Sequence, residues 1–111
     1  MAKEAAPPSA RRDRLKPHTP KLVEYTSTVI YGDLWERTAL SKRDRSLVTV
    51  AALVACYRPE QLNTHIQRAL ANGVTKEEIA EIITHCAFYT GWPGSMTAAH
   101  VLADVMEGNK V

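Results

Sequence analysis

The chain has 111 residues, which fits one domain of ordinary size, and 45% of them are hydrophobic. Fourteen basic residues against 12 acidic ones leave a formal net charge of +2, which is too weak a balance to predict nucleic-acid binding. No stretch approaches the roughly 18 apolar residues of a membrane span, and the charged, Pro-rich start lacks a signal-peptide core. We therefore expect neither nucleic acid nor membrane as a partner, and a cytoplasmic location.

Residues 1–18 show no periodic apolar pattern and contain three prolines. Four basic side chains, those of Arg11, Arg12, Arg14 and Lys16, cluster in this segment without interleaved aromatic residues, so it resembles a solvated leader more than a phosphate-binding arm. We expect a disordered or extended tail over residues 1–18, followed by a single helical domain over residues 19–111.

The first half of this domain shows three helical signals. Thr19 before Pro20 is typical of an N-cap and a first helical residue, and the apolar stripe that follows predicts a helix ending near Gly32. Residues 33–37 predict one more short turn. The nearly all-apolar run 47–56 allows a buried strand or a buried helix, and its alanines, with the Ser41 cap, favour the helix.

The second half contains three further helices with clear boundaries. Pro59 begins one, and Asn72-Gly73 predicts its left-handed cap. Thr75 and Glu78 form a capping-box pattern before a helix that ends at Gly91. A last helix runs from Pro93 to near Gly108, so the sequence predicts an all-α fold of five or six helices.

Two features extend this fold prediction to assembly and redox state. The apolar content exceeds what roughly 90 folded residues easily hide, which indicates burial between subunits of a homo-oligomer. Cys56 and Cys86 show neither metal-ligand nor redox spacing, and we expect two reduced, buried thiols.

Four tracts in succession resemble the carboxymuconolactone decarboxylase family of the AhpD-like superfamily. They are residues 40–49 (LSKRDRSLVT), 58–65 (RPEQLNTH), 69–79 (ALANGVTKEEI) and 81–93 (EIITHCAFYTGWP). The resemblance implies an AhpD-like all-α fold, trimers or hexamers, and a place in aromatic compound catabolism. It also implies a cofactor-free lyase that removes CO2 from a small carboxylated lactone.

Two positions depart from the patterns of the superfamily. The peroxidase branch carries Cys-x-x-Cys-x-x-x-His, and counting back from His65 the two cysteine positions are Arg58 and Gln61. Neither residue can form a thiolate, so thiol peroxidase chemistry is disfavoured. Decarboxylase members of the family often have a cysteine directly after the tyrosine of this tract. This chain has Thr90 at that position and so departs from the decarboxylase pattern.

The implied reaction requires a proton donor, because the carbon that loses CO2 must be protonated. The substrate accepts the electron pair itself, so we expect no cofactor and no metal. The match to the family histidine makes His65 the first candidate for the acid. Glu81, His85 and Tyr89 recur every four residues and share one helix face, where Glu81 could fix the His85 tautomer and Tyr89 could donate to substrate.

Three further residues are candidates for substrate binding. Arg45 and Arg58 carry guanidinium groups, whose geometry matches a carboxylate. Trp92 is expected to form the wall of a pocket or of an interface. The function predicted from these residues is a decarboxylase or isomerase acting on a small carboxylic acid, with a non-catalytic oligomeric scaffold and a thiol-dependent oxidoreductase as alternatives.

Overall fold

The computed structural model describes residues 10–108, and every regular element within that range is helical. The chain divides between Ala39 and Leu40 into two compact units. Part of the expected tail, residues 1–9, lies outside the described residues. The remainder includes a short helix, α1 (Ala10–Asp13), so residues 10–13 are helical where the sequence predicted a disordered or extended segment.

The first unit is built around one helical rod. Helix α2 (Pro20–Tyr25) continues into the π-helical turn η1 (Thr26–Ile30), and the 3-10 turn η2 (Leu34–Glu36) follows. The predicted helix and short turn are therefore present. The predicted cap differs, because the Thr19 hydroxyl donates to the Leu15 carbonyl (3.3 Å) and does not accept a bond from the helix.

Glycine is required where the π-helical turn ends. A Cβ atom on Gly32 would lie 2.7 Å from the carbonyl oxygens of both Ser27 and Thr28, which is inside van der Waals contact with backbone. The chain can then turn, and the Tyr31 and Trp35 rings stack with their centroids 6.3 Å apart. Trp35 is buried and anchors this turn.

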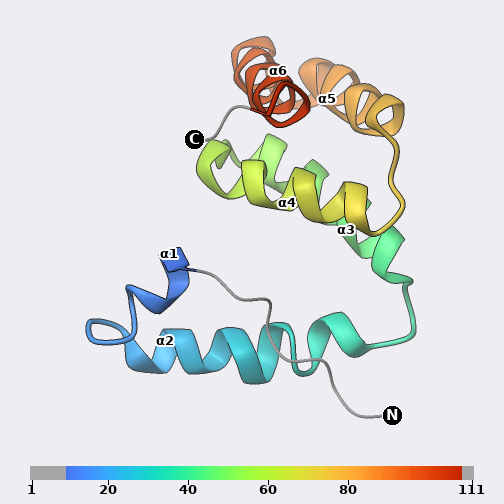
Figure 1. The fold of residues 1–111 in the computed structure, drawn as a ribbon. Coiled ribbons are helices and arrows are strands. Elements are labelled where there is room, and N and C mark those ends of the chain that lie inside the picture. The colour runs from blue at the N-terminus through green and yellow to red at the C-terminus, as the bar shows by residue number, and fades with distance from the viewer. Residues whose placement is uncertain (1–9, 109–111) are drawn as a thin grey trace. The chain divides into compact units, whose positions relative to one another are not determined.

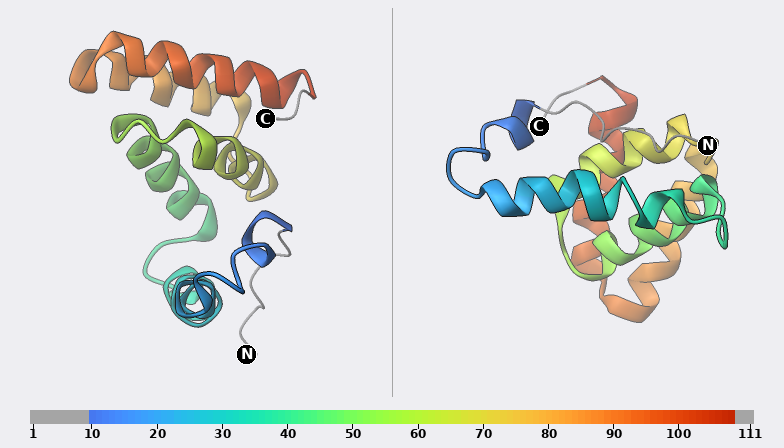
Figure 2. Two further views of the ribbon diagram at one scale, coloured as in Figure 1. Left: turned by 90° about the vertical axis from the view of Figure 1, so that its left-hand side faces the viewer. Right: turned by 90° about the horizontal axis from the view of Figure 1, so that it is seen from below.

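The second unit consists of two layered helical hairpins. Helices α3 (Lys42–Ala55) and α4 (Pro59–Ala71) form one hairpin, and α5 (Lys76–Thr90) and α6 (Trp92–Met106) form the other (Figure 1). Helix α3 packs against α5, and α4 packs against α6. The turned views in Figure 2 show the α5–α6 layer lying across the α3–α4 layer.

The core lies between the two hairpins. Its four most buried large side chains, all at most 1% exposed, are Val50, Leu62, Ile66 and Ile79. Each contributes about 1.5–3 kcal/mol of transfer free energy, since apolar burial is the main favourable term in folding. The side of α3 that faces away from the core is exposed although it is apolar, since Val48 is 59% exposed within one chain.

Local sequence signals set the ends of these helices. The Ser41 hydroxyl accepts from the backbone N–H of Asp44 (3.0 Å) at the start of α3. Gly73 follows α4 at φ +96°, and Gly91 separates α5 from α6 at φ +117°. Both angles lie in the left-handed region that glycine adopts without steric cost, so the predicted helix ends are confirmed.

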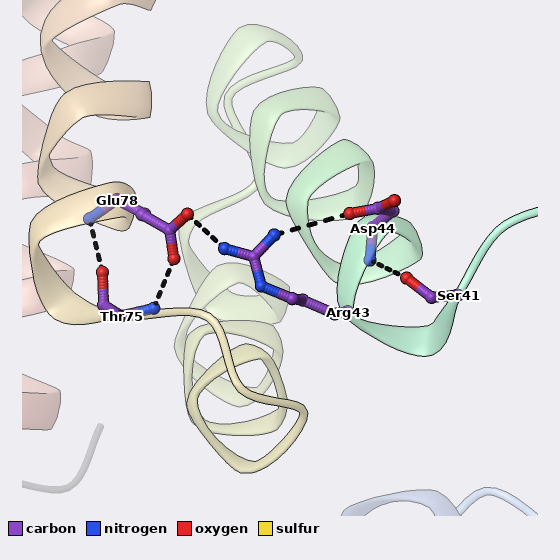
Figure 3. Close-up of polar contacts among 5 residues, drawn as sticks. All are labelled: Ser41, Arg43, Asp44, Thr75 and Glu78. Carbon is purple, nitrogen blue, oxygen red and sulfur yellow. Dashed lines mark hydrogen bonds and ion pairs between the residues drawn. The ribbon is translucent and has the colours of Figure 1, made fainter.

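One carboxylate joins the start of α5 to α3 (Figure 3). Glu78 Oε1 accepts from the backbone N–H of Thr75 (2.9 Å), and the Thr75 hydroxyl accepts from the backbone N–H of Glu78 (3.1 Å). The other oxygen, Oε2, accepts from Arg43 Nη2 on α3. The Thr75 N–H and then Arg43 hold the pKa of Glu78 below its usual range, so the carboxylate stays charged at neutral pH.

Buried and half-buried polar side chains connect the helices in pairs. Asn72 Nδ2 donates to Ser46 Oγ (3.0 Å), which joins the end of α4 to α3. Ser95 Oγ donates to the Ile83 carbonyl (2.8 Å), which joins α6 to α5 in a buried site. Because each group is paired, these polar atoms can be buried without the full cost of desolvation.

We predict that Thr75→Ala lowers the free energy of unfolding by about 1 kcal/mol, because the N-cap acceptor is lost. Urea denaturation followed by circular dichroism measures the change. Thr84→Ala is the matched control on the same helix, since Thr84 is exposed and donates only to the Ala80 carbonyl, and should change stability by less than about 0.5 kcal/mol. Equal effects of the two variants would contradict a capping role.

Candidate active site

A groove of about 340 Å³ lies between α3 and α5. Helix α3 contributes Ala51, and α5 contributes the remaining lining residues, which are Glu78, Glu81, Ile82, His85 and Cys86. The residues from α5 recur at intervals of three or four, so they share one side of that helix. One face of α5 therefore provides nearly the whole groove.

The groove combines an apolar floor with polar groups near its opening. Ala51, Ile82 and Cys86 are buried or half-buried, whereas Glu81 and His85 are exposed. If a substrate carboxylate lies against the apolar floor, few water molecules can solvate it. A histidine next to the bound substrate can exchange protons with it. This arrangement suits proton transfer to or from a small molecule held against α5.

Tyr89 extends the polar face by one more turn of α5. Its ring stacks on that of His85 with centroids 4.7 Å apart and an interplanar angle of 19°. The stack limits the rotation of the imidazole. Within residues 10–108 no hydrogen bond joins Glu81 to His85, so fixing of the His85 tautomer by Glu81 stays a prediction.

His65 lies on α4 and is half-buried. Burial lowers the pKa of its imidazole below the usual value of 6.5, because the charged form is poorly solvated. Burial therefore favours the neutral ring of His65 in the folded protein. His65 is not among the six described residues that line the groove, and its catalytic role stays a prediction.

The three substrate-binding candidates also lie outside these six residues. Arg45 is half-buried in the first turn of α3. Arg58 is exposed at the corner between α3 and α4, where its Nη1 donates to the carbonyls of Cys56 (2.7 Å) and Tyr57 (3.2 Å). Trp92 begins α6 and meets Phe88 edge to face, with centroids 5.8 Å apart.

Sequence patterns alone missed part of the groove. The capping-box pattern fully explains a glutamate at position 78, so nothing in the sequence indicates that the Glu78 carboxylate also lines the groove. Ile82 and Cys86 read as core residues. The i, i+4, i+8 series Glu78, Ile82 and Cys86 runs beside Glu81 and His85, and this helical spacing is the signal that could have identified them.

The cysteine prediction is wrong for one of the two thiols. Cys86 is buried on α5, but Cys56 is exposed, because it follows the last residue of α3 at the corner. Neither is in a disulfide. Over residues 10–108, no group of three His, Cys, Asp or Glu side chains is arranged to hold a metal ion.

The fold and the groove define a small helical domain, and comparison with known proteins identifies its family. The model of the carboxymuconolactone decarboxylase family matches residues 20–104. The chain belongs to this family, which confirms the resemblance and the AhpD-like all-α fold.

The relatives include two decarboxylases. The chain is 40% identical over 83 residues, 75% of its length, to 4-carboxymuconolactone decarboxylase of Acinetobacter baylyi. It is 35% identical over 68 residues, 61% of its length, to nitrosuccinic acid decarboxylase of Metarhizium robertsii. It is also 31% identical over 77 residues, 68% of its length, to an uncharacterised 15.0-kDa protein of Paracoccus denitrificans. These matches span 62%, 48% and 58% of the respective relatives.

The helices of the second unit have no membrane-spanning character. Between residues 10 and 108, no helix is both long enough and apolar enough to cross a bilayer. The longest helices, α5 and α6, have 15 residues each, and a bilayer-spanning helix requires about 20.

We predict that stability falls as the pH is lowered below about 6.5 and that His65 contributes to this fall. The folded state disfavours protonated His65. At pH values between the lowered pKa of His65 in the folded state and its usual pKa in the unfolded state, the unfolded state therefore binds more protons. Urea unfolding at pH 7.5 and 5.5 should show a smaller loss for His65→Gln than for wild type. His100→Gln, on an exposed part of α6, is the matched control. Equal losses in wild type and His65→Gln would contradict the assignment.

Proposed function

We propose that this chain is a decarboxylase of a small carboxylic acid and that its substrate binds in the groove between α3 and α5. The 40% identity to 4-carboxymuconolactone decarboxylase is the observation that carries the proposal. A second decarboxylase among the relatives supports the same class of reaction. The groove, with a histidine beside an apolar floor, supplies a place for it.

The names of these relatives indicate the substrate class. Carboxymuconolactone carries a lactone carbonyl, and nitrosuccinic acid carries a nitro group. Each of these groups can accept the electron pair that remains when the bond to the carboxyl carbon breaks. Such a substrate provides its own electron sink, so the reaction requires no cofactor from the protein. We therefore propose a carboxylic acid with an electron-accepting group near the carboxylate that leaves.

We assign the proton transfer to His85 and the exclusion of water to the apolar residues of the groove. The bond to the carboxyl carbon breaks, CO2 leaves, and the electron pair moves into the acceptor group. His85 then delivers a proton to carbon and regains one from water. Tyr89 holds the His85 ring by stacking, and Ile82 and Cys86 keep water from the carboxylate that leaves.

We expect wild-type protein to release CO2 from γ-carboxymuconolactone or nitrosuccinate without added metal or thiol. His85→Ala should lower kcat by at least about 100-fold, since acid–base groups contribute about 10²–10⁴. His100→Ala is the matched control, because this histidine is exposed on α6 outside the groove. Ultraviolet absorbance and CO2 release measure turnover, and circular dichroism checks folding.

The same assay separates the rival assignments. A large loss in folded His65→Ala, with His85→Ala fully active, would move the proton donor to α4, where the family resemblance favours it. Absence of turnover by wild type with both acids would contradict these substrates and favour a non-catalytic oligomeric scaffold. Activity that depends on added thiol would favour the oxidoreductase alternative.

A further inference from the structure

The groove between α3 and α5 carries an unbalanced charge. Two of its six described lining residues, Glu78 and Glu81, are acidic, and none is lysine or arginine. Arg43 pairs with Glu78 (Figure 3), whereas Glu81 has no ion pair within residues 10–108. The carboxylate of Glu81 therefore disfavours a second negative charge close to it in the groove, and an uncharged ligand meets no such repulsion.

The carboxylate of Glu81 has a proton-accepting neighbour one turn further along α5. Side chains four residues apart on a helix are neighbours, and both Glu81 and His85 are exposed where they line the groove. When the His85 ring accepts a proton, the resulting imidazolium has a negative charge partner on the next turn. The two side chains are therefore suited to remove a proton from a bound molecule as well as to deliver one.

The size and the floor of the groove suit a small uncharged ring. Its volume of about 340 Å³ lies near the lower end of the range for ligand pockets, which is about 300–1,000 Å³. Ala51, Ile82 and Cys86 form an apolar floor, against which the apolar face of a ring can lie without burying an unpaired polar group. Charge and floor therefore both favour a neutral ring, and the proton-accepting histidine favours one with a weakly acidic C–H bond.

Loss of CO2 and loss of a proton lead to the same kind of intermediate. In a decarboxylation, the electron pair of the broken C–C bond moves into an acceptor group, and in a deprotonation the pair of the broken C–H bond does so. In a lactone with a double bond between its β and γ carbons, removal of a proton from the α carbon gives a dienolate with the charge on the carbonyl oxygen. Protonation at the γ carbon then leaves the double bond between the α and β carbons.

We propose that this groove isomerises neutral β,γ-unsaturated lactones, with His85 as the proton carrier. The imidazole takes the proton from the α carbon, the carbonyl oxygen holds the charge of the dienolate, and the imidazolium gives a proton to the γ carbon. Glu81 stays ionised and acts through His85 as the charge partner of the imidazolium. No atom is gained or lost, and neither an oxidant nor a reductant takes part. The choice of His85 rests on the proposed function, whereas turnover of a neutral lactone does not require decarboxylase activity.

The activity is tested with α-angelica lactone, an uncharged β,γ-unsaturated lactone, in D2O by proton nuclear magnetic resonance. Relative to buffer alone, wild type should accelerate formation of the conjugated isomer and place deuterium on its γ carbon. Folded His85→Ala should be at least about 100-fold slower. His100→Ala, exposed on α6, is the matched control and should keep the wild-type rate. A wild-type rate equal to that of buffer, or full activity of His85→Ala, would overturn the proposal.

The role of Glu81 is tested by two effects of opposite sign. Glu81→Gln keeps the size of the side chain and removes its charge, so it should lower kcat for the lactone and leave KM nearly unchanged. The same variant should bind succinate, measured as an inhibitor, about fivefold more tightly, because a like charge has been removed. Glu81→Asp, which keeps the charge, should recover much of kcat. Weaker succinate binding together with slower lactone turnover in Glu81→Gln would indicate damage to the groove and overturn this role.

Release of CO2 from γ-carboxymuconolactone and from nitrosuccinate, measured on the same samples, separates this activity from the proposed function. Isomerisation of the lactone without CO2 release from either acid would uphold the inference and contradict decarboxylation of these acids. Release of CO2 without isomerisation would uphold the proposed function and overturn the inference. We expect both activities in wild type, and we expect His85→Ala to lose both.

Discussion

The Glu78 carboxylate links the start of α5 to α3. One oxygen closes the capping box with Thr75, and the other receives the Arg43 guanidinium from α3. An exposed ion pair of this kind contributes little free energy, and the energy of the fold comes from the core between the hairpins. The contribution of Glu78 is local, because it closes the capping box at the start of α5 and meets Arg43 on the side of α5 that faces α3.

That orientation lets α5 serve both the core and the groove. Ile79 and Ile83 face the interior, where Ile79 is fully buried. The five residues of α5 that line the groove lie on the adjacent side of the same helix, next to α3. Because rigid helices hold these side chains, the groove does not depend on a loop for its shape. Figure 1 shows α5 and α6 as one hairpin. Helix α5 of this hairpin contributes five of the six described residues that line the groove.

Local signals allowed most of the fold to be predicted. Ser41, Thr75, Gly73 and Gly91 determine helix ends through bonds and angles within a few residues, and each prediction was correct. The π-helical turn at 26–30 was not predicted, because it has no distinct period in the apolar pattern. Thr19 does not cap α2 through its side chain, and its hydroxyl instead donates to the Leu15 carbonyl one turn earlier.

The site was harder to predict because it depends on how helices face one another. The Glu81, His85 and Tyr89 series was identifiable from spacing alone, since it lies on one helix. The distance between α4 and the groove is a property of packing, so the sequence could not place His65 relative to α5. The exposure of Tyr89 and Cys56 likewise follows from which helix ends remain uncovered in one chain.

The central claim, that the groove between α3 and α5 binds the substrate, can be tested directly by nuclear magnetic resonance of the four histidine side chains. Each imidazole is assigned by its own variant, and succinate is added as a dicarboxylate that does not react. The account predicts a saturable shift of the His85 resonances, since His85 lines the groove, while His65 on α4 responds weakly. A saturable shift of His65 with His85 unchanged would contradict the groove as the binding site.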